Sequence, residues 1–404
     1  HLTFQIWDVF QRDAMQAICD AYTEKNPDVV IEVQVTSWNE YWTKLEASAE
    51  SNTMPDIYWM HTNELLKYAD FGMLADVTDL YGDPNYYTDH FSEISINNTL
   101  GSNGRMYGVP KDKDNLVLVY NKTMFDQAGV AYPDENWTWD DLCNASQQIY
   151  DTTGKYGYLA YCDDQSGYWN FVYQKGGCIL TEDKTKGGFD QQATIDAMKF
   201  YIGLQKNDWC PDQNYFGETT PDSAFFSRQG AIFLNGNWNL FQSMQNYPDM
   251  MGEWDVAVLP RCPDPASGDG RATISNGLCY STAARGKNLE IVLDVLKFFG
   301  TEEAQRIAGS YGAAIPAYEG TEDSWVSAFD QFEYDLNVEC VLDQFEYAVQ
   351  SPNNAARPKW KSQVNDELLK IYSGSVDADT GLANVQKYIN TATDDSIARA
   401  NKNK

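Results

Sequence analysis

The first 75 residues alternate strand-like and helix-like segments, and this pattern restricts the fold more than any other feature of the chain. Three segments have the length and composition of strands: 4–7, 31–35 and 56–60. Apolar residues recur at helical spacing from Met15 to Tyr22, between the first and second of these segments. A second helix is expected over 41–50, between the second and third segments. Such alternation predicts an α/β fold with a mostly parallel sheet covered by helices. Ligands of these sheets bind at the loops that follow the carboxyl ends of the strands.

A second alternating region starts at residue 115 and continues to about 259. Strands are expected over 255–259 and over 273–282, followed by a helix that ends at Gly300. The chain has 404 residues, which is more than one hydrophobic core usually serves, so two lobes are expected. No run of 18 apolar residues is present, and no signal peptide is evident before the first strand, so we expect a mature or trimmed product.

The acidic composition limits the possible ligands. The formal net charge is -30 at pH 7, and the sequence has no cluster of Lys and Arg. Such a surface repels nucleic acid and anionic lipid, and it disfavours strongly anionic ligands. We therefore expect no nucleic-acid partner, and we interpret the charge mainly as a source of solubility outside the cell.

Eight cysteines occur, and none forms a C-x-x-C pair, so zinc-binding and thioredoxin-like functions have little support. Several lie in apolar positions of expected helices or strands, which predicts buried free thiols. One or more disulfides are the alternative for an exported chain, and their pairing does not follow from the sequence. The cysteines are Cys19, Cys143, Cys162, Cys178, Cys210, Cys262, Cys279 and Cys340.

The segment from Gly104 to Leu142 is the most informative part of the chain. It contains a tetrad of charged residues at 111–114 and then an apolar strand-like run at 115–121. Thr138 begins the sequence T-W-D-D and is followed three residues later by Asp141, which predicts a capping box at the start of a helix.

The order of motifs in this segment resembles extracellular solute-binding proteins of family 1, the maltose-binding-protein-like sugar-binding subunits of ABC importers. These motifs are Y-G-x-P, the charged tetrad, a strand ending in Y-N-K, F-D-x-A-G-V and W-T-W-D-D-L. Further blocks resemble the family in the same order, at residues 21–35, 54–59, 226–238, 256–260 and 312–316. The region from Glu319 onward resembles it least, apart from a helical ending.

The resemblance implies a periplasmic-binding-protein-like type II fold, in which two α/β lobes are joined by a hinge of several crossings around a ligand cleft. Lobe one would comprise residues 1–111 and 261–316, and lobe two residues 112–260 and 317–404. The implied function is high-affinity binding of a carbohydrate, expected to be an oligosaccharide, and its delivery to the permease subunits of an ABC importer by hinge closure. The protein is then a monomer outside the cytoplasm, either a cell-surface lipoprotein or a periplasmic protein.

Trp238 is the first candidate for ligand contact. It follows the apolar run 231–234 and lies in the sequence Asn235-Gly236-Asn237-Trp238, where a glycine permits close approach of the backbone. Its flat face suits stacking on a sugar ring, and ordinary packing under the loop is the alternative.

The charged tetrad supplies two polar candidates, Asp112 and Asp114. A carboxylate accepts hydrogen bonds from two hydroxyl groups, and such charge-assisted bonds are strong. The resemblance favours Asp114 as a ligand contact. The alternative is a solvated hinge loop in which Lys111 and Lys113 pair with the two carboxylates.

Other candidates follow expected strands or belong to regions that contact ligand in the family. A structural role is the alternative for each, and a lone histidine in particular is more often structural. Those after strands of the first region are Asp8, Trp38, Asn39, His61 and Asn63, and the others are Gln165, Tyr168, Asn235, Asn276, Tyr311, Arg357 and Trp360.

No catalytic, metal or cofactor motif stands out. The chain has 59 acidic residues, so pairs of carboxylates are unavoidable and none is selected by its spacing. The segment 377–381 resembles a calcium loop weakly, and a helix start at Asp377 fits it better. We therefore expect a binding protein without a cofactor; a glycoside hydrolase or a non-transport surface protein that binds carbohydrate is the alternative.

Overall fold

The computed structural model describes residues 1–51 and 53–402, which form two compact units. Unit 1 comprises residues 1–114 and 276–333, and unit 2 comprises residues 115–275 and 334–404. The first boundary follows Asp114, close to the expected position. The second and third boundaries lie later in the chain than the expected positions near 260 and 316. Residues 261–275 belong to unit 2, and residues 317–333 belong to unit 1.

Unit 1 is built on a five-stranded sheet in the order β2-β1-β3-β11-β4. The three strands predicted in the first 75 residues are present, and β1 pairs in parallel with both β2 and β3. The later strand β11 runs antiparallel to β3 and β4, so the sheet is only partly parallel. The strands are β1 (Leu2–Ile6), β2 (Ile31–Val35), β3 (Ile57–His61), β4 (Val109–Pro110) and β11 (Leu278–Ser281).

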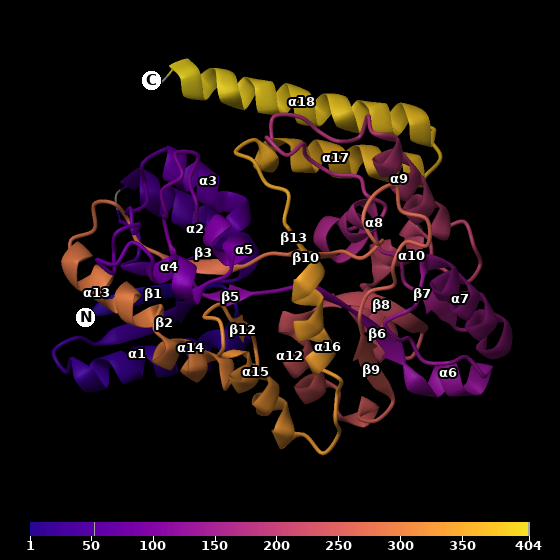
Figure 1. Cartoon of the computed structure of the whole chain (residues 1–404), viewed down its shortest axis with the longest axis horizontal. Coiled ribbons are helices and arrows are strands. Elements are labelled where there is room, and N and C mark those ends of the chain that lie inside the picture. Colours follow the sequence, from indigo (N-terminus) through magenta and orange to yellow (C-terminus); the bar gives the residue numbers. More distant parts are fainter. Residues whose placement is uncertain (52, 403–404) are drawn as a thin grey trace. The chain divides into compact units, whose positions relative to one another are not determined.

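Side chains alternate between the two faces of this sheet, so each face has its own core. Ile57 and Trp59 pack with the helices α1, α13 and α14, whereas Tyr58 and Met60 pack with α2 and α3. Figure 1 shows these two sets of helices on opposite sides of β1–β3. The helices of unit 1 are α1 (Arg12–Lys25), α2 (Trp38–Ser51), α3 (Thr62–Asp70), α4 (Tyr86–His90), α5 (Glu93–Asn97), α13 (Leu289–Phe299), α14 (Glu302–Gly309) and α15 (Glu322–Ala328).

Unit 2 contains a four-stranded sheet in the order β7-β8-β6-β9. β6 occupies the expected strand position and is fully buried, since it lies between β8 and β9 and pairs antiparallel with both. A two-stranded parallel ladder joins β10 and β13. The strands are β6 (Leu116–Asn121), β7 (Tyr156–Tyr158), β8 (Gly230–Gly236), β9 (Trp254–Ala257), β10 (Thr273–Ser275) and β13 (Ala348–Gln350).

The predicted capping box begins a helix of unit 2. The Thr138 hydroxyl accepts a hydrogen bond from the Asp141 backbone N–H, and the Asp141 carboxylate accepts one from the Thr138 N–H. The helices of unit 2 are α6 (Lys122–Ala128), α7 (Trp139–Thr153), α8 (Trp169–Gln174), α9 (Gln192–Leu204), α10 (Gln213–Glu218), α11 (Pro221–Phe226), α12 (Leu240–Asn246), α16 (Glu339–Asp343), α17 (Arg357–Tyr372) and α18 (Ala378–Lys402).

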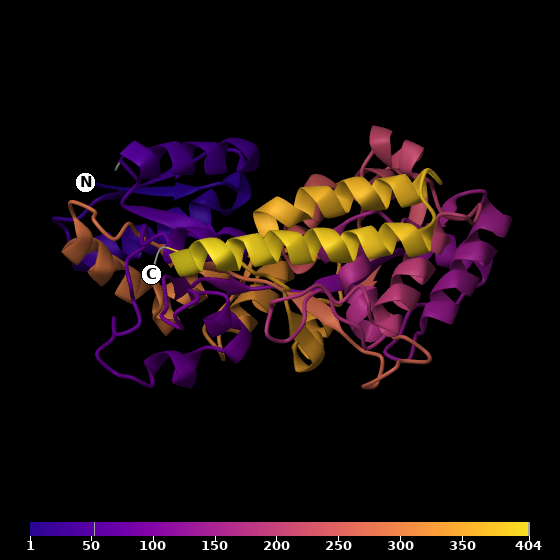
Figure 2. The ribbon, with the colours of Figure 1, turned by 90° about the horizontal axis from the view of Figure 1, so that it is seen from above.

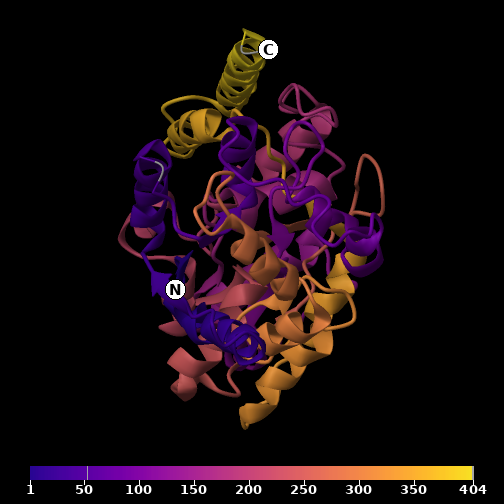
Figure 3. The same cartoon turned by 90° about the vertical axis from the view of Figure 1, so that its left-hand side faces the viewer.

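The helical ending expected from the sequence is a pair of long helices, α17 and α18. They run side by side in Figure 1, and Figures 2 and 3 show the same pair from two other directions. Asp377 precedes α18 and accepts hydrogen bonds from the backbone N–H and the hydroxyl of Thr380. It therefore caps a helix, as predicted.

The expectation of one strand over residues 273–282 is wrong. The run divides into β10, which pairs with β13 in unit 2, and β11, which belongs to the sheet of unit 1. Asn276 and Gly277 separate the two strands. A Cβ on Gly277 would lie 2.7 Å from the Asp112 carbonyl oxygen, so a larger residue does not fit where the chain passes from one sheet to the other.

All eight cysteines are free thiols, as predicted, and five of them are buried. Of the helices in the described ranges, none combines the length and the apolar character needed to cross a lipid bilayer.

Candidate functional site

A cluster of aromatic rings lies at the carboxyl ends of β1 and β3 in unit 1. The Trp7 ring centroid lies 5.0 Å from that of Trp38, 5.7 Å from that of Trp42 and 6.3 Å from that of His61. Trp38 lies 5.6 Å from His61 and is 42% exposed. The position after a strand predicted Trp38 and His61, and the structure places both with Trp7 and Trp42 in one partly exposed aromatic surface.

Polar groups border this aromatic cluster. The Asp8 carboxylate accepts hydrogen bonds from the Phe10 N–H at 2.9 Å and the Gln11 side-chain amide at 3.0 Å. His61 Nδ1 accepts a hydrogen bond from the Asn63 N–H at 3.1 Å, which leaves Nε2 to carry the proton in the neutral ring. Asp8 and His61 are therefore held in fixed orientations beside the rings.

Two further candidates of unit 1 are exposed residues. Asn39 is exposed on α2, next to Trp38. Tyr311 follows α14, is 42% exposed, and is not one of the rings of the cluster. The ligand contacts expected of these two residues stay predictions.

Three residues of the charged tetrad, Lys111, Asp112 and Lys113, are buried rather than solvated. Lys111 Nζ lies 2.5 Å from Asp112 Oδ2 and 2.8 Å from Gln11 Oε1, and it sits 4.4 Å from the centre of the Trp59 ring. The other Asp112 oxygen accepts a hydrogen bond from the Leu278 N–H at 2.8 Å. Both Asp112 oxygens are thus engaged within unit 1. These bonds hold the Asp112 carboxylate in place within unit 1, and its contact with ligand stays a prediction.

The other half of the tetrad is similarly held. Lys113 Nζ lies 2.6 Å from Glu322 Oε1, so it has an ion-pair partner on α15, outside the tetrad. Asp114 and Asn276 are bonded to each other, since the Asn276 N–H donates to Asp114 Oδ1 at 2.6 Å and the Asp114 N–H donates to the Asn276 carbonyl at 3.2 Å. Asp114 remains half-buried, so its role as a ligand contact stays a prediction.

In unit 2, Trp238 lies in a short 3-10 turn directly after β8. The turn spans Asn237–Asn239, and Trp238 is half-buried against the core of the unit. The Asn235 side-chain oxygen accepts hydrogen bonds from the Gly236 N–H and from the Asn239 side chain, both at 2.9 Å. Asn235 is therefore occupied in shaping the loop that carries Trp238.

One candidate of unit 2, Arg357, forms a buried ion pair with Asp164. Arg357 is 3% exposed, and its guanidinium donates to Asp164 at 2.8 Å and to Asn353 at 2.9 Å while lying 4.9 Å from the Trp169 ring centre. Trp360 is 2% exposed, and its indole N–H donates to Asn354.

Tyr168 is also buried in the core of unit 2, and Gln165 is half-buried beside Asp164. Arg357, Trp360 and Tyr168 are thus buried within unit 2, and the ligand contacts expected of them stay predictions.

Asp163, next to the ion pair of Asp164 and Arg357, should make the free energy of unfolding depend on pH. Burial and the charge of Asp164 raise the pKa of Asp163 to about 6, whereas Arg357 and Lys361 hold the pKa of Asp164 below its ordinary value in spite of burial. Because the folded-state pKa of Asp163 is raised, its protonated form contributes stability below about pH 4, and this contribution is lost as the pH rises through about 6.

Replacing Asp163 with Asn should remove this dependence. In urea unfolding, the free energy of unfolding of the variant minus that of the parent protein should rise by about 1–3 kcal/mol from pH 4 to pH 7. Asn retains a side-chain oxygen for the Ser166 N–H, which now donates to Asp163 at 2.8 Å. If variant and parent differed in stability by the same amount at pH 4 and at pH 7, the raised pKa assigned to Asp163 would be contradicted.

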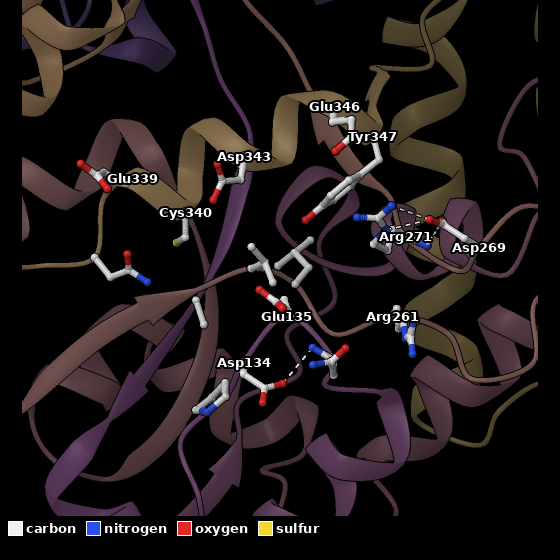
Figure 4. Close-up of a pocket in the computed structure, with 16 residues that line it drawn as sticks. Asp134, Glu135, Arg261, Asp269, Arg271, Glu339, Cys340, Asp343, Glu346 and Tyr347 are labelled. Carbon is white, nitrogen blue, oxygen red and sulfur yellow. Dashed lines mark hydrogen bonds and ion pairs between the residues drawn. The ribbon is translucent and has the colours of Figure 1, made fainter.

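A groove of about 800 Å³ opens in unit 2 between the end of β9 and α16, and none of the predicted ligand residues lines it. Figure 4 shows that Arg271 lies against Tyr347 and pairs with Asp269, while other carboxylates project from several elements around the groove. These carboxylates are Asp134, Glu135, Glu339, Asp343 and Glu346.

Comparison with known proteins identifies the chain. The family model described as bacterial extracellular solute-binding protein matches residues 11–306. The chain belongs to this family. An arabinooligosaccharide-binding protein of Halalkalibacterium halodurans is 26% identical to this solute-binding protein. The match covers 57% of the present chain and 56% of the relative. The matched regions span 56 to 61% of the length of the first curated relatives.

Solved structures show the fold of this solute-binding protein. An ABC substrate-binding protein from Listeria monocytogenes, solved with cycloalternan, has a TM-score of 0.83 at 23% identity, with 96% of this chain and 98% of that chain covered. A cyclic α-maltosyl-1,6-maltose binding protein from Arthrobacter globiformis has a TM-score of 0.80 at 25% identity, with 97% and 98% covered. The predicted periplasmic-binding-protein-like type II fold is thereby confirmed.

Sequence reasoning did not include Trp7 and Trp42 among the ligand candidates. Trp7 is the ring around which the cluster of this solute-binding protein forms, and it directly follows β1. The rule that placed Asp8 at the strand end could equally have selected Trp7. Trp42 lies one helical turn after Trp38, and the 5.4 Å separation of the two rings follows from that spacing.

Proposed function

We propose that this solute-binding protein binds a neutral carbohydrate, an oligosaccharide, and delivers it to the permease subunits of an ABC importer. The aromatic cluster of Trp7, Trp38 and Trp42 with His61 carries the proposal, because a partly exposed aromatic surface suits the apolar faces of sugar rings. Trp238 is the corresponding aromatic candidate in unit 2.

The polar candidates fit the same ligand class. Asp8, His61 and Asn63 lie beside the cluster, and their carboxylate, imidazole and amide groups suit hydroxyl groups. The net charge of -30 disfavours an anionic solute. The sugar-binding relatives add support, since the family consists of binding proteins. We propose that the protein acts as a monomer outside the cytoplasm, tethered by a lipid anchor or free in a periplasm, and that it leaves its ligand chemically unchanged.

A thermal-shift screen tests the proposal. A ligand that binds only the folded state raises the unfolding temperature, and at about 100 times its Kd it adds about 2.7 kcal/mol of stability. The panel should include arabino-oligosaccharides, cyclic and linear gluco-oligosaccharides, and an amino acid and a phosphate ester as controls. We expect a rise with at least one neutral oligosaccharide and none with the controls. Release of shorter sugars on long incubation would instead indicate a hydrolase.

Replacing Trp238 with Ala should weaken binding of the sugar found in this screen by about 1–3 kcal/mol, because stacking area is lost. Trp360→Ala is not a suitable control, since that ring is buried in the core. A matched control is Tyr132→Ala, which removes a 38%-exposed aromatic ring elsewhere in unit 2 and should leave affinity unchanged. Unchanged affinity in a folded Trp238→Ala variant would assign this ring to packing alone.

A further inference from the structure

Gly236, the last residue of β8, occupies a position where no side chain fits. A Cβ added to it would lie 2.3 Å from Cη2, 2.3 Å from Cζ2 and 2.4 Å from Cζ3 of Trp238. Carbon atoms in contact are normally about 3.5–4.0 Å apart. The six-membered ring of the Trp238 indole therefore fills the space that the Cβ of any other residue would need.

The three distances also show how the ring is oriented. Cη2 is bonded to both Cζ2 and Cζ3, and a point beside the ring edge would be much closer to Cη2 than to its two neighbours. Only a point above or below the ring face is almost equally distant from all three atoms. One face of the Trp238 indole therefore rests on Gly236, so a ring that stacks on Trp238 can do so only on the opposite face.

The backbone of Gly236 does not itself require glycine. Its φ of -77° and ψ of 143° lie in the extended region that every L-residue adopts. The ring, rather than the backbone conformation, accounts for glycine at this position.

The loop around Trp238 cannot easily shift to make room. On one side, the Asn235 side chain bonds to the Gly236 N–H and to Asn239. On the other side, the Asn237 N–H donates to the Asn115 carbonyl at 3.1 Å, and Asn237 is 1% exposed. A side chain at 236 would therefore move the indole rather than the loop.

We propose that Gly236 is a positioning residue for ligand binding: it supports one face of the Trp238 indole and so fixes the plane in which the other face meets a sugar ring. This inference rests on the proposed function, and it adds that a single ring face of the ligand stacks at this position. A replacement of Gly236 should therefore act only through Trp238.

A double-mutant cycle tests this role. Gly236→Ala should weaken affinity for the sugar found in the thermal-shift screen about tenfold, whereas the same replacement in a Trp238→Ala background should change affinity less than twofold. The near-UV circular dichroism spectrum should change in Gly236→Ala, since a ring moves. Gly217→Ala is the matched control, because its Cβ would meet nothing within 4 Å, and it should change neither readout.

The outcomes separate the inference from the proposed function. Equal losses of affinity in the two backgrounds, or no loss in either, would overturn the positioning role. If the parent protein binds no sugar at all, the proposed function fails. The near-UV circular dichroism spectrum still tests whether Gly236 orients the Trp238 ring, because the change caused by Gly236→Ala should be absent in the Trp238→Ala background. If Gly236→Ala does not fold, the double variant should fold, since the obstructing ring is gone; a double variant that also fails to fold would overturn the proposal.

Discussion

Replacing Lys111 with Met should lower the free energy of unfolding of unit 1 by about 3–5 kcal/mol. The ammonium group lies 2.5 Å from the Asp112 carboxylate, and the two side chains are 2% and 9% exposed. Met keeps most of the volume of Lys, but it leaves the Asp112 charge buried without a cation and removes the partner of Gln11 Oε1. Urea unfolding followed by tryptophan fluorescence and circular dichroism measures the change.

Two further variants make this prediction specific. Lys25→Met removes one partner of an ion pair with Glu303 in which both side chains are 52% exposed, so it should cost less than about 1 kcal/mol. The double variant Lys111→Met/Asp112→Asn should recover part of the stability, since no uncompensated charge remains. A Lys111→Met variant as stable as the Lys25→Met control would show that the buried pair does not stabilise unit 1.

The second large effect is expected at Arg357 in unit 2. Arg357→Met should lower stability by about 3–5 kcal/mol, because Asp164 would keep only Lys361, whose side chain is 43% exposed and lies 3.3 Å away. The variant also loses the hydrogen bond to Asn353 and the contact with the Trp169 ring. Arg306→Met, which breaks exposed ion pairs with Glu302 and Asp323, should leave stability almost unchanged.

The Arg357 variant also distinguishes support from ligand contact. If Arg357 supports the core, sugar affinity measured well below the unfolding temperature should change less than about threefold while stability falls. A loss of affinity comparable to that of Trp238→Ala, with stability unchanged, would support the sequence prediction that Arg357 contacts the ligand.

Features determined by neighbouring residues could be predicted from the sequence. The capping box of Thr138 and Asp141 needs only two residues three positions apart, and the strands β1, β2 and β3 follow from short apolar runs. The strand-end rule placed Asp8, Trp38 and His61 at one edge of a sheet because parallel strands of one sheet end at the same edge.

Features that depend on distant partners could not be predicted. Arg357 meets Asp164, which is 193 residues away in the chain, so nothing near Arg357 shows that its charge is neutralised in the core. Asp112 looked available for a ligand, and its bond to the Leu278 N–H spans 166 residues. The apolar run at 273–282 gave no sign that its two halves pair with strands of different sheets.

Isothermal titration calorimetry of the parent protein with the oligosaccharide that gives the largest thermal shift tests the central claim most directly. The account predicts saturable binding at one site with a Kd of about 1 μM or tighter, equivalent to at least about 8 kcal/mol of binding free energy. It also predicts weaker binding by Trp238→Ala. No saturable binding of any neutral oligosaccharide at millimolar concentration would contradict the assignment of this protein to carbohydrate capture.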